Sequence, residues 1–433
     1  MHTAIALILF CTLALSKKNG MFIGLDNLPK QPFEYRMGSN EDNPNRAPVI
    51  FCGGLSGGAL MFKKDNLQDT PTLCTKSSDD FYQGWINTGL LVPKITQPCL
   101  FHEIEPVFVN GSVQSKPGIT VVPKDYGGHE GVTYIGTTAL TGINIGGYAI
   151  SLFNYLADKA GYKFGEDLRG ANYDWRLGPK EYSRPNGDYH NFKNLIEETY
   201  NKNSNKRVHL IGHSLGGCYI QTFLTTYVSQ EWKDKYVSSL ISLAGSYLGA
   251  PMAAIEMATG TSFGIPMFDK DGVKRVMRKM GGAAWMLPTP NDEVMYITPK
   301  RNYTNSQLKE FFQDMKSPET FEIYQNEMEF GEKTKAPSVP VYCMYGVGSP
   351  TVTAAKMPEA DAPTNIDVDE IIKQDGDETV PFYSLSACDA FANNQDQNKY
   401  PVVVDRFKGV THRGIVSDAK ILERVLNIVT SNK

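Results

Sequence analysis

The chain has 433 residues, of which 41% are hydrophobic and 21% are charged. This ordinary globular composition excludes a fibrous, collagen-like or largely disordered protein. The 43 Lys and Arg nearly balance the 47 Asp and Glu, so the formal net charge is −4. Because nucleic-acid-binding domains carry a basic excess, we expect no nucleic-acid partner.

An apolar run at the amino terminus has the length of a signal-peptide core. Residues 4–15 are mostly apolar, which is too short to span a bilayer, and small residues precede Lys17. The sequence therefore predicts a signal peptide over residues 1–16 and a place in the secretory pathway, either lysosomal or extracellular. A buried amino-terminal strand is the alternative. Cleavage would leave six of the seven cysteines, an even number that permits disulfides without giving their pairing.

Short β-rich runs alternate with helical patterns along the rest of the chain. Strands are predicted at residues 47–52, 206–212, 237–244, 339–345 and 401–407. Helices are predicted at residues 148–160, 192–201, 215–228 and 418–429. This alternation is typical of the α/β class, in which helices cover both faces of a mostly parallel sheet. Two stretches, at about 63–105 and 250–335, break the alternation, and we expect them to be insertions in a single domain that spans residues 17–433.

Three Gly-x-Ser-x-Gly segments compete for the role of nucleophile. Ser214, at the centre of Gly-His-Ser-Leu-Gly, follows a buried-strand pattern and precedes a long helix. An α/β-hydrolase places its nucleophile on such a strand-turn-helix elbow, where the glycines keep the sharp turn free of clashes. Ser262 follows a helical pattern, and Ser56 follows a strand but precedes a loop, so ordinary turns are expected at both. We therefore predict an α/β-hydrolase fold with Ser214 as the nucleophile.

The histidine of such a site follows from chain order. In this fold the nucleophile comes first, the acid second and the histidine last. His412 is the only histidine after Ser214, and it lies between the last predicted strand and the last predicted helix. His213 is adjacent to Ser214, but neighbouring side chains diverge at such an elbow. A packed structural histidine is therefore expected at His213.

The acid is expected after the fourth predicted strand, in the segment 375–381. In a catalytic triad this carboxylate fixes the tautomer of the histidine and stabilises its positive charge. Asp377 is the predicted acid. Its rivals, for which turn formation is the expected role, are Asp375 and Glu378, with Asp369 as a remoter candidate.

The tetrahedral intermediate of acyl transfer needs two preorganised N–H donors. One is expected from Leu215, the residue after the nucleophile. The other is expected from the glycine-rich loop at residues 53–58, which follows the first predicted strand. The sequence contains no Walker motif, no complete dinucleotide fingerprint and no His-Glu-x-x-His, so we expect neither a cofactor nor a metal.

Taken together, the motifs resemble the family of lecithin–cholesterol acyltransferase and lysosomal phospholipase A, over nearly the whole mature sequence. The matching motifs are Tyr-Asp-Trp-Arg-Leu at 173–177, Ile-Gly-His-Ser-Leu-Gly at 211–216, Ile-Thr-Pro with Asn-Tyr-Thr at 297–304, Val-Tyr-Cys-Met-Tyr-Gly-Val-Gly at 341–348 and Asp-Gly-Asp with Thr-Val at 375–380. The resemblance implies Ser214, Asp377 and His412 as the triad and an oxyanion N–H at Leu55. The first motif is either a wall of the lipid site or an Asp–Arg pair with a packed Trp in the core.

The same resemblance implies the pairing of two disulfides, which are Cys74–Cys99 and Cys343–Cys388. Cys52 and Cys218 would then be free, and packing is their expected role, with a reactive thiol as the alternative. The loop that the first disulfide closes is a membrane-binding element in the family. The lipid-contact residues expected in this loop are Trp85, Phe81, Leu90 and Leu91.

A basic amphipathic segment offers a second candidate for lipid contact. Apolar side chains recur at helical spacing on one of its faces, at Val273, Val276, Met277 and Met280. The other face carries Lys274, Arg275, Arg278 and Lys279. Such a helix suits an anionic membrane surface. The alternative is a lid helix in a cap, packed on the core with a solvated basic side.

These features predict a serine-dependent phospholipase A and O-acyltransferase of lipid metabolism. It would form an acyl-Ser214 intermediate from a glycerophospholipid at a membrane or lipoprotein surface, and it would transfer the acyl group to water or to a lipid alcohol. One alternative is a neutral-lipid lipase or esterase. Another is a catalytically silent lipid-binding protein on the same fold, which the complete triad disfavours.

Overall fold

The computed structural model describes residues 46–91, 94–137, 144–261, 268–362 and 370–431. The predicted signal peptide lies outside the described residues, as do Ser262 and Asp369. Within the described ranges, every helix is too short or too polar to cross a bilayer.

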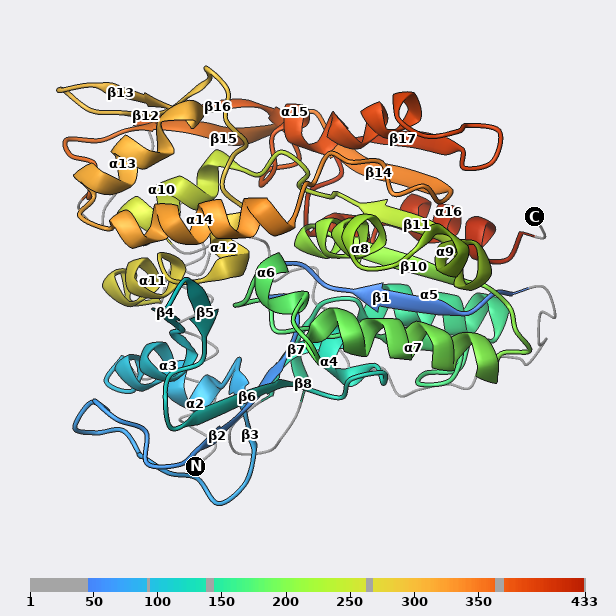
Figure 1. Ribbon diagram of the computed structural model, residues 1–433, viewed down its shortest axis with the longest axis horizontal. Coiled ribbons are helices and arrows are strands. Elements are labelled where there is room, and N and C mark those ends of the chain that lie inside the picture. The colour runs from blue at the N-terminus through green and yellow to red at the C-terminus, as the bar shows by residue number, and fades with distance from the viewer. Residues whose placement is uncertain (1–45, 92–93, 138–143, 262–267, 363–369, 432–433) are drawn as a thin grey trace, which may run out of the picture.

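A six-stranded sheet forms the centre of the molecule (Figure 1). Its strand order is β17-β14-β11-β10-β1-β9, and every neighbouring pair is parallel. The strands are β1 (Val49–Cys52), β9 (Leu168–Gly170), β10 (Val208–His213), β11 (Val237–Leu243), β14 (Val341–Val347) and β17 (Val402–Lys408). All five predicted strands are confirmed, with ends that differ by at most two residues. The sequence pattern missed β9 because three residues, one of them an arginine, are too few to show a period.

Helices cover both faces of this sheet, which confirms the predicted α/β-hydrolase class. One face carries α7 (Asp188–Lys202), α8 (Leu215–Thr226) and α9 (Gln230–Tyr236), and the other carries α5 (Ile150–Ala160) and α16 (Ala419–Val429) (Figure 1). Because β10 is covered on both sides, all of its residues are buried. The shorter helices between these elements are α4 (Glu130–Thr133), α6 (Pro179–Tyr182), α15 (Phe382–Leu385), η2 (Asn305–Gln307), η4 (Ser386–Asn393) and η5 (Gly414–Val416).

A second sheet has four strands in the order β13-β12-β15-β16. We call this sheet and the helices packed around it the cap. Its strands are β12 (Val294–Ile297), β13 (Asn302–Thr304), β15 (Ser349–Lys356) and β16 (Ile371–Gly376). Its helices are α10 (Pro251–Thr259), α11 (Lys270–Met277), α12 (Gly281–Trp285), α13 (Leu308–Asp314) and α14 (Pro318–Phe330). The stretch at 250–335 supplies β12 and β13, whereas β15 and β16 come after β14, so the cap draws on two segments of the chain.

The stretch at 63–105 contributes to a third, antiparallel sheet of order β3-β2-β6. Its elements are β2 (Leu60–Lys64), β3 (Tyr82–Trp85), β6 (Ile119–Pro123), α2 (Thr88–Leu91) and α3 (Gln97–Ile104). The predicted disulfide Cys74–Cys99 is present and joins the loop between β2 and β3 to α3. Two hairpins lie nearby, formed by β4 (Val107–Val109) with β5 (Ser112–Gln114) and by β7 (Tyr134–Thr137) with β8 (Asn144–Gly147).

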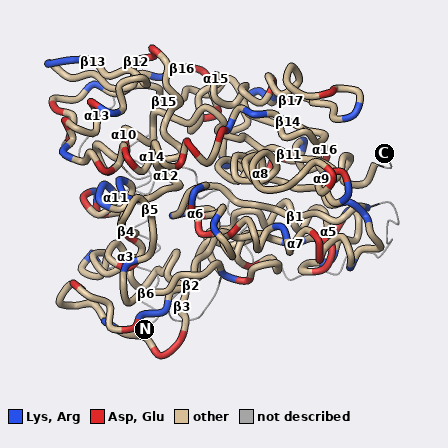
Figure 2. The backbone as a smooth tube through the Cα atoms, in the orientation of Figure 1, with Lys and Arg blue, Asp and Glu red and all other residues tan. Residues whose placement is uncertain are grey.

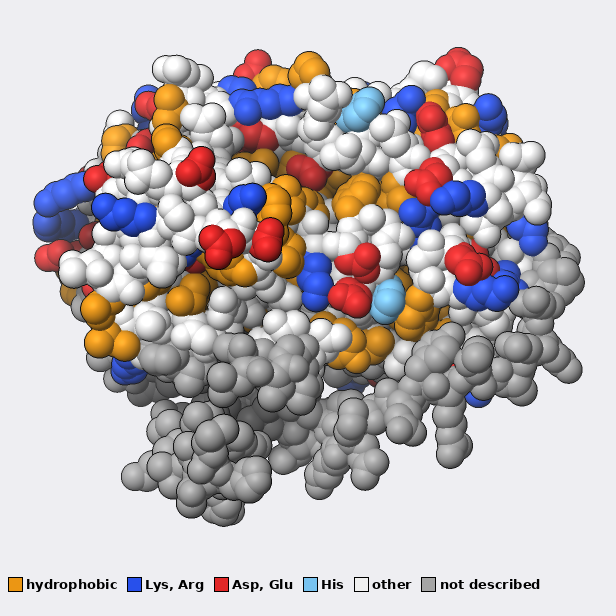
Figure 3. Space-filling model, turned by 90° about the horizontal axis from the view of Figure 1, so that it is seen from below, with side chains coloured by type: hydrophobic (Ala, Val, Ile, Leu, Met, Phe, Trp, Pro, Cys, Tyr) orange, Lys and Arg blue, Asp and Glu red, His pale blue; other side chains and the backbone are white. Residues whose placement is uncertain are grey.

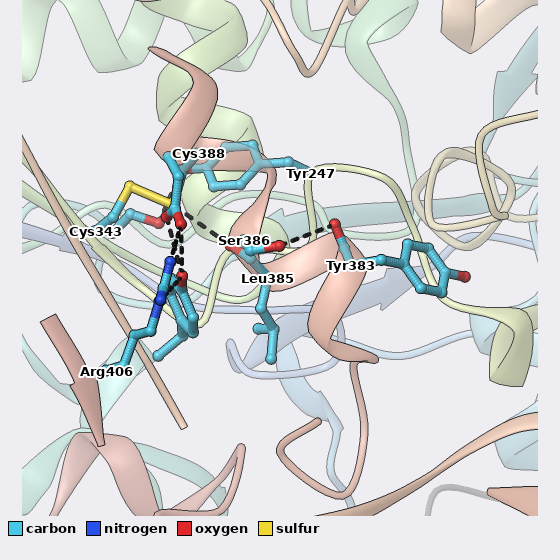
Figure 4. The surroundings of a disulfide bond; sticks show 10 residues. Tyr247, Cys343, Tyr383, Leu385, Ser386, Cys388 and Arg406 are labelled. Carbon is cyan, nitrogen blue, oxygen red and sulfur yellow. Dashed lines mark hydrogen bonds and ion pairs between the residues drawn. A yellow bond between two sulfur atoms is a disulfide. The ribbon is translucent and has the colours of Figure 1, made fainter. Parts of the chain in front are cut away.

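The second predicted disulfide, Cys343–Cys388, is also present and joins β14 to η4 (Figure 4). Beside it, Arg406 of β17 pairs with Asp389 at 2.6 Å and donates to the Tyr345 hydroxyl at 2.8 Å. The chain that follows the cap is therefore attached to two strands of the main sheet.

Two cysteines remain unpaired next to the predicted elbow. Cys52 ends β1, and Cys218 lies on α8 with its Sγ 3.9 Å from Ser246 Oγ. Both are buried, and burial raises the pKa of both thiols. Because the thiolate is the reactive form, these surroundings fit packing rather than thiol chemistry.

Helix α11 packs its apolar side into the molecule and pairs its basic side with carboxylates. Val273, Val276 and Met277 are buried. The ion pairs of the basic side are Arg275–Glu105 (3.0 Å), Lys279–Glu105 (2.8 Å), Arg278–Asp361 (2.5 Å) and Lys274–Asp361 (3.5 Å). Figure 2 shows this run of Lys and Arg at α11. The structure therefore has a packed cap helix here, and a membrane role for it stays a prediction.

A pair of buried carboxyl groups lies where α14 packs on α6. Glu327 of α14 is 1% exposed, and Glu181 of α6 is 4% exposed. Glu181 Oε1 accepts the N–H of Val113, and Glu327 Oε2 accepts the N–H of Lys180, both at 3.1 Å. Apart from Glu327 itself, no donor among the described residues reaches Glu181 Oε2. Burial and the neighbouring Glu181 raise the pKa of Glu327 well above its usual range, so Glu327 holds a proton beside that carboxylate.

We expect Glu327→Gln to remove a pH dependence from the stability of the protein. Because folding raises this pKa, the folded chain binds more protons than the unfolded chain above about pH 4. The stability that Glu327 contributes is therefore complete below that pH and falls as the pH rises toward the folded pKa. In thermal unfolding between about pH 5 and pH 8, the Tm of the wild type should fall more steeply than that of Glu327→Gln.

Glu329→Gln is the matched control, because Glu329 is an exposed glutamate on the same helix. Its Tm should follow the wild-type pH profile. If Glu327→Gln also follows the wild-type profile, Glu327 does not hold the proton.

Candidate active site

Ser214 lies on the sharp turn between β10 and α8. Its backbone has φ 56° and ψ −124°, a conformation that residues with side chains rarely adopt. A Cβ at Gly212 would lie 2.5 Å from Gly216 O, and one at Gly216 would lie 2.4 Å from Cys52 O. Only glycine fits at these two positions, because each lies against neighbouring backbone. The strand and the helix predicted on either side of Ser214 are both present.

Asp377 and His412 contact each other through two hydrogen bonds. His412 Nδ1 lies 2.7 Å from Asp377 Oδ2, and the His412 backbone N–H donates to Asp377 O at 2.7 Å. The other carboxylate oxygen, Oδ1, accepts the N–H groups of Thr379 (3.1 Å) and Val380 (2.7 Å). Asp377 is fully buried, so these bonds fix the carboxylate against the histidine ring.

The chain reaches Asp377 through the cap. After β14 it runs along β15 and returns along β16, which ends at Gly376, directly before Asp377. The Asp377 backbone forms a β-bridge with Ser349, the first residue of β15. A Cβ at Gly346 would lie 1.8 Å from Val410 O and 3.3 Å from Asp377 Cβ. Three parts of the chain therefore meet at Gly346, namely the end of β14, the segment before His412, and Asp377 itself. Only glycine fits at this position.

Asp375, for which turn formation was expected, lies on strand β16, so that expectation is wrong, whereas Glu378 and Ser56 lie outside helices and strands. Asp375 is exposed, and its Oδ1 accepts the N–H of Gly348 at 2.6 Å. Glu378 is exposed and has a φ of 81°. Ser56 has a φ of 57° and lies in a loop with no helix after it. Among the described residues, none of these three side chains makes a hydrogen bond or ion pair with Asp377 or His412.

In the structure the glycine-rich loop extends over residues 53–59, one residue beyond its predicted end, and it lies against Ser214. A Cβ at Gly54 would be 2.8 Å from Ser214 Cβ, so the loop backbone approaches the serine only because this residue has no side chain. Four side chains donate to carbonyl oxygens of the loop. These bonds are Tyr173 hydroxyl to Gly53 O (2.9 Å), Trp85 Nε1 to Ser56 O (2.9 Å), Trp175 Nε1 to Gly58 O (2.8 Å) and Asn172 Nδ2 to Ala59 O (2.5 Å). The loop is therefore held in place by the protein itself.

The two residues expected to supply oxyanion N–H groups flank the serine. Leu215 is the first residue of α8 and is fully buried. Leu55 follows Gly54 in the glycine-rich loop and is partly buried.

The residues expected to contact lipid differ widely in exposure. Trp85 is 8% exposed and packs edge-on against Trp175, with ring centroids 5.2 Å apart. Leu91 is also buried and Leu90 is partly buried, whereas Phe81 is 42% exposed. Trp85 is therefore buried against the glycine-rich loop. Of the four residues, Phe81 is the exposed one.

The Tyr-Asp-Trp-Arg-Leu motif forms core structure. Arg176 is fully buried and pairs with Asp174 at 2.6 Å, and Trp175 between them is buried as well. The core alternative for this motif is therefore the one observed. The hydrogen bonds from Trp175 and Trp85 to the glycine-rich loop could not be predicted from the sequence, because no local pattern indicates which distant carbonyl an indole N–H will meet.

Comparison with known proteins shows the family. The family model described as lecithin:cholesterol acyltransferase matches residues 81–335 and 319–422. Phosphatidylcholine-sterol acyltransferase of Mus musculus is 31% identical over 388 residues, covering 87% of this chain and 84% of that protein. Lysosomal phospholipase A and acyltransferase of Rattus norvegicus is 29% identical over 385 residues, covering 87% of this chain and 88% of that protein. The solved structure of the Tle4-Tli4 complex covers 89% of this chain and 98% of that chain, at 14% identity and a TM-score of 0.49.

The family match covers the Ser214 elbow, the Asp377 turn and His412, and begins after the glycine-rich loop. The chain therefore belongs to the lecithin:cholesterol acyltransferase family.

Proposed function

We propose that Ser214, Asp377 and His412 are the catalytic triad of a phospholipid acylhydrolase and O-acyltransferase. The observation that carries the proposal is the 2.7 Å contact between His412 Nδ1 and the buried Asp377 carboxylate, next to a serine on a strained elbow. Asp377 orients the imidazole so that Nε2 faces away from the carboxylate and is available to take a proton. A lipid-binding protein without activity would not need this arrangement.

In the proposed reaction, Ser214 Oγ attacks the ester carbonyl of a glycerophospholipid while His412 Nε2 takes the hydroxyl proton. The tetrahedral intermediate expels the lysophospholipid, which receives that proton from His412, and acyl-Ser214 remains. Water or a lipid alcohol then attacks the acyl group and gives its proton to His412. The second tetrahedral intermediate collapses, the proton returns to Ser214 Oγ, and the fatty acid or new ester leaves.

The backbone N–H groups of Leu215 and Leu55 are the proposed oxyanion donors. Leu215 begins the helix directly after the nucleophile, where the first N–H groups have no partner within the helix. Leu55 follows Gly54, whose backbone lies against Ser214. Because several side chains fix the glycine-rich loop, its N–H groups need no rearrangement as charge develops.

The chain is a serine-dependent enzyme of the secretory pathway, an environment in which its two disulfides persist. Two relatives are named for phosphatidylcholine-sterol acyl transfer and for phospholipase A and acyl transfer, which supports a glycerophospholipid as the acyl donor. We propose a single domain in which the stretch at 63–105 and the cap serve lipid contact at a membrane or lipoprotein surface. The face in Figure 3 mixes charges of both signs with hydrophobic side chains, so apolar contact is favoured over long-range electrostatic attraction as the means of lipid contact.

We expect the wild-type protein to release fatty acid and lysophospholipid from phosphatidylcholine liposomes. Ser214→Ala should lower turnover by about four orders of magnitude or more, because the nucleophile is lost. Products are measured by mass spectrometry at acid and neutral pH, with and without sterol in the liposomes. Sterol ester among the products would identify a lipid alcohol as an acyl acceptor.

Ser306→Ala, a change at an exposed serine far along the chain, is the control and should leave turnover unchanged. Hydrolysis of triglyceride or short esters without any activity on phosphatidylcholine would favour a neutral-lipid lipase or esterase. Equal turnover by Ser214→Ala and the wild type would exclude this catalytic site.

We further expect Asp377→Asn to lower kcat by about 10⁴-fold, because the amide no longer holds the productive histidine tautomer. Asp375→Asn should change kcat less than about threefold, since Asp375 is exposed and bonds to the Gly348 N–H. Both variants are assayed on the same phospholipid substrate. A larger loss for Asp375→Asn than for Asp377→Asn would mean that the acid is misidentified.

A further inference from the structure

His213, which precedes the nucleophile, makes two hydrogen bonds to opposite sides of the site. Its Nε2 lies 2.9 Å from the backbone oxygen of His412. Its Nδ1 is hydrogen-bonded to the Tyr148 hydroxyl. The side chain is buried, and its ring lies 4.9 Å from the His412 ring between centroids. His213 therefore touches the backbone of His412 on one side and a tyrosine on the other.

The chemistry of the partners determines where the protons lie. A backbone carbonyl only accepts, so Nε2 must carry the hydrogen that bonds to His412 O. Burial lowers the pKa of His213 to about 3, so the ring is neutral and Nδ1 is an acceptor. The Tyr148 hydroxyl must then donate to Nδ1. Its oxygen remains free to accept, and it receives the N–H of Gly54 at 2.9 Å.

These bonds form one directed chain from the glycine-rich loop to the segment that carries His412. The order is Gly54 N–H to Tyr148, Tyr148 O–H to His213, and His213 Nε2–H to His412 O. Each donor and acceptor in the chain is used once, in the only direction that its chemistry permits. The network thus connects Gly54, the residue before Leu55, with the backbone of His412, and these two residues lie on different sides of Ser214.

Packing shows that the loop is shaped around Tyr148. A Cβ at Gly57 would lie 2.9 Å from the Tyr148 hydroxyl oxygen, and one at Gly53 would lie 3.1 Å from its ring. Tyr148 itself is held between β8 and α5, where its N–H donates to Thr133 O at 2.8 Å. The ring therefore fits against two glycines of the loop while its hydroxyl receives the N–H of a third.

We propose that Tyr148 and His213 are positioning residues, which fix the position of the glycine-rich loop relative to His412 on the two sides of Ser214. The inference rests on the proposed triad and oxyanion donors. Neither side chain reacts. Their role is to keep the N–H of Leu55 and the imidazole of His412 in the relative positions that the tetrahedral intermediate requires, so their loss should affect the chemical step more than substrate binding.

The test measures two rates on the full-length protein. The first is kcat and KM for phosphatidylcholine in liposomes. The second is the rate at which an alkyl fluorophosphonate labels Ser214, a reaction in which the serine displaces fluoride at phosphorus and which needs no natural substrate. The variants are Tyr148→Phe, which removes only the hydroxyl, His213→Gln, which removes the imidazole, and the double variant.

Tyr162→Phe is the matched control. Tyr162 is also buried, and its hydroxyl donates to Ala47 O at 2.7 Å beyond the other end of β1, away from the site. The loss of one buried hydroxyl is therefore common to both variants, but only Tyr148→Phe breaks the chain to His213. Tm values measured for each protein separate a loss of stability from a loss of rate.

We expect Tyr148→Phe to lower kcat and the labelling rate by about 10- to 100-fold, with KM within about twofold of the wild type. Tyr162→Phe should match the wild type in both rates. Because the bonds act as one chain, the double variant should lose little more than the worse single variant. His213→Gln provides the same comparison if Tyr148→Phe does not fold.

Two results would overturn the inference alone. In the first, the fluorophosphonate labels the wild type, and folded Tyr148→Phe has the same kcat and the same labelling rate as the wild type. The second is a double variant whose losses multiply, which would make the two residues independent. Failure of the fluorophosphonate to label Ser214 in the wild type would instead overturn the triad, and the inference with it.

Discussion

The proposed active site depends on a close approach of three backbone segments to Ser214. The elbow, the first turn of α8 and the glycine-rich loop meet at distances that exclude a Cβ at Gly212, Gly216 or Gly54. The strained backbone of Ser214 persists because β10 is buried between parallel strands and α8 begins directly after the turn. Ser214, the proposed nucleophile, and the glycine-rich loop that faces it are therefore one rigid unit, held by the core of the main sheet.

The proposed acid, Asp377, joins this unit by a longer route, which makes the cap part of the geometry of the proposed triad. Asp377 comes directly after β16, a strand of the cap sheet, yet it lies beside Gly346 at the end of β14 in the main sheet. The disulfide between Cys343 and Cys388 attaches the chain on the far side of Asp377 to the same strand. Movement of the cap sheet relative to the main sheet would thus pull on the carboxylate that orients His412.

Aromatic residues hold the glycine-rich loop in place because they combine an apolar body with one polar atom. Trp85 and Trp175 pack against each other in the interior and still direct their N–H groups to carbonyl oxygens of the loop. Trp85 lies at the end of β3, between the two cysteines of the Cys74–Cys99 disulfide. The segment expected to meet lipid is in this way attached to the loop expected to stabilise the oxyanion, which offers a physical path from surface contact to the reaction centre.

The sequence by itself determined the class of fold, five of the six strands of the main sheet and the elbow at Ser214, and it indicated the proposed order of nucleophile, acid and histidine, because each depends on local pattern or on chain order. It also indicated Asp377 over Asp375, and the family resemblance implied both disulfides. The sequence did not reveal that β15 and β16 join the cap, that Trp85 is buried, or that His213 and Tyr148 connect Gly54 to His412. These facts were decided by the tertiary structure, because strand pairing and hydrogen bonds between residues far apart in the chain depend on which segments fold against each other, and no local period records that choice.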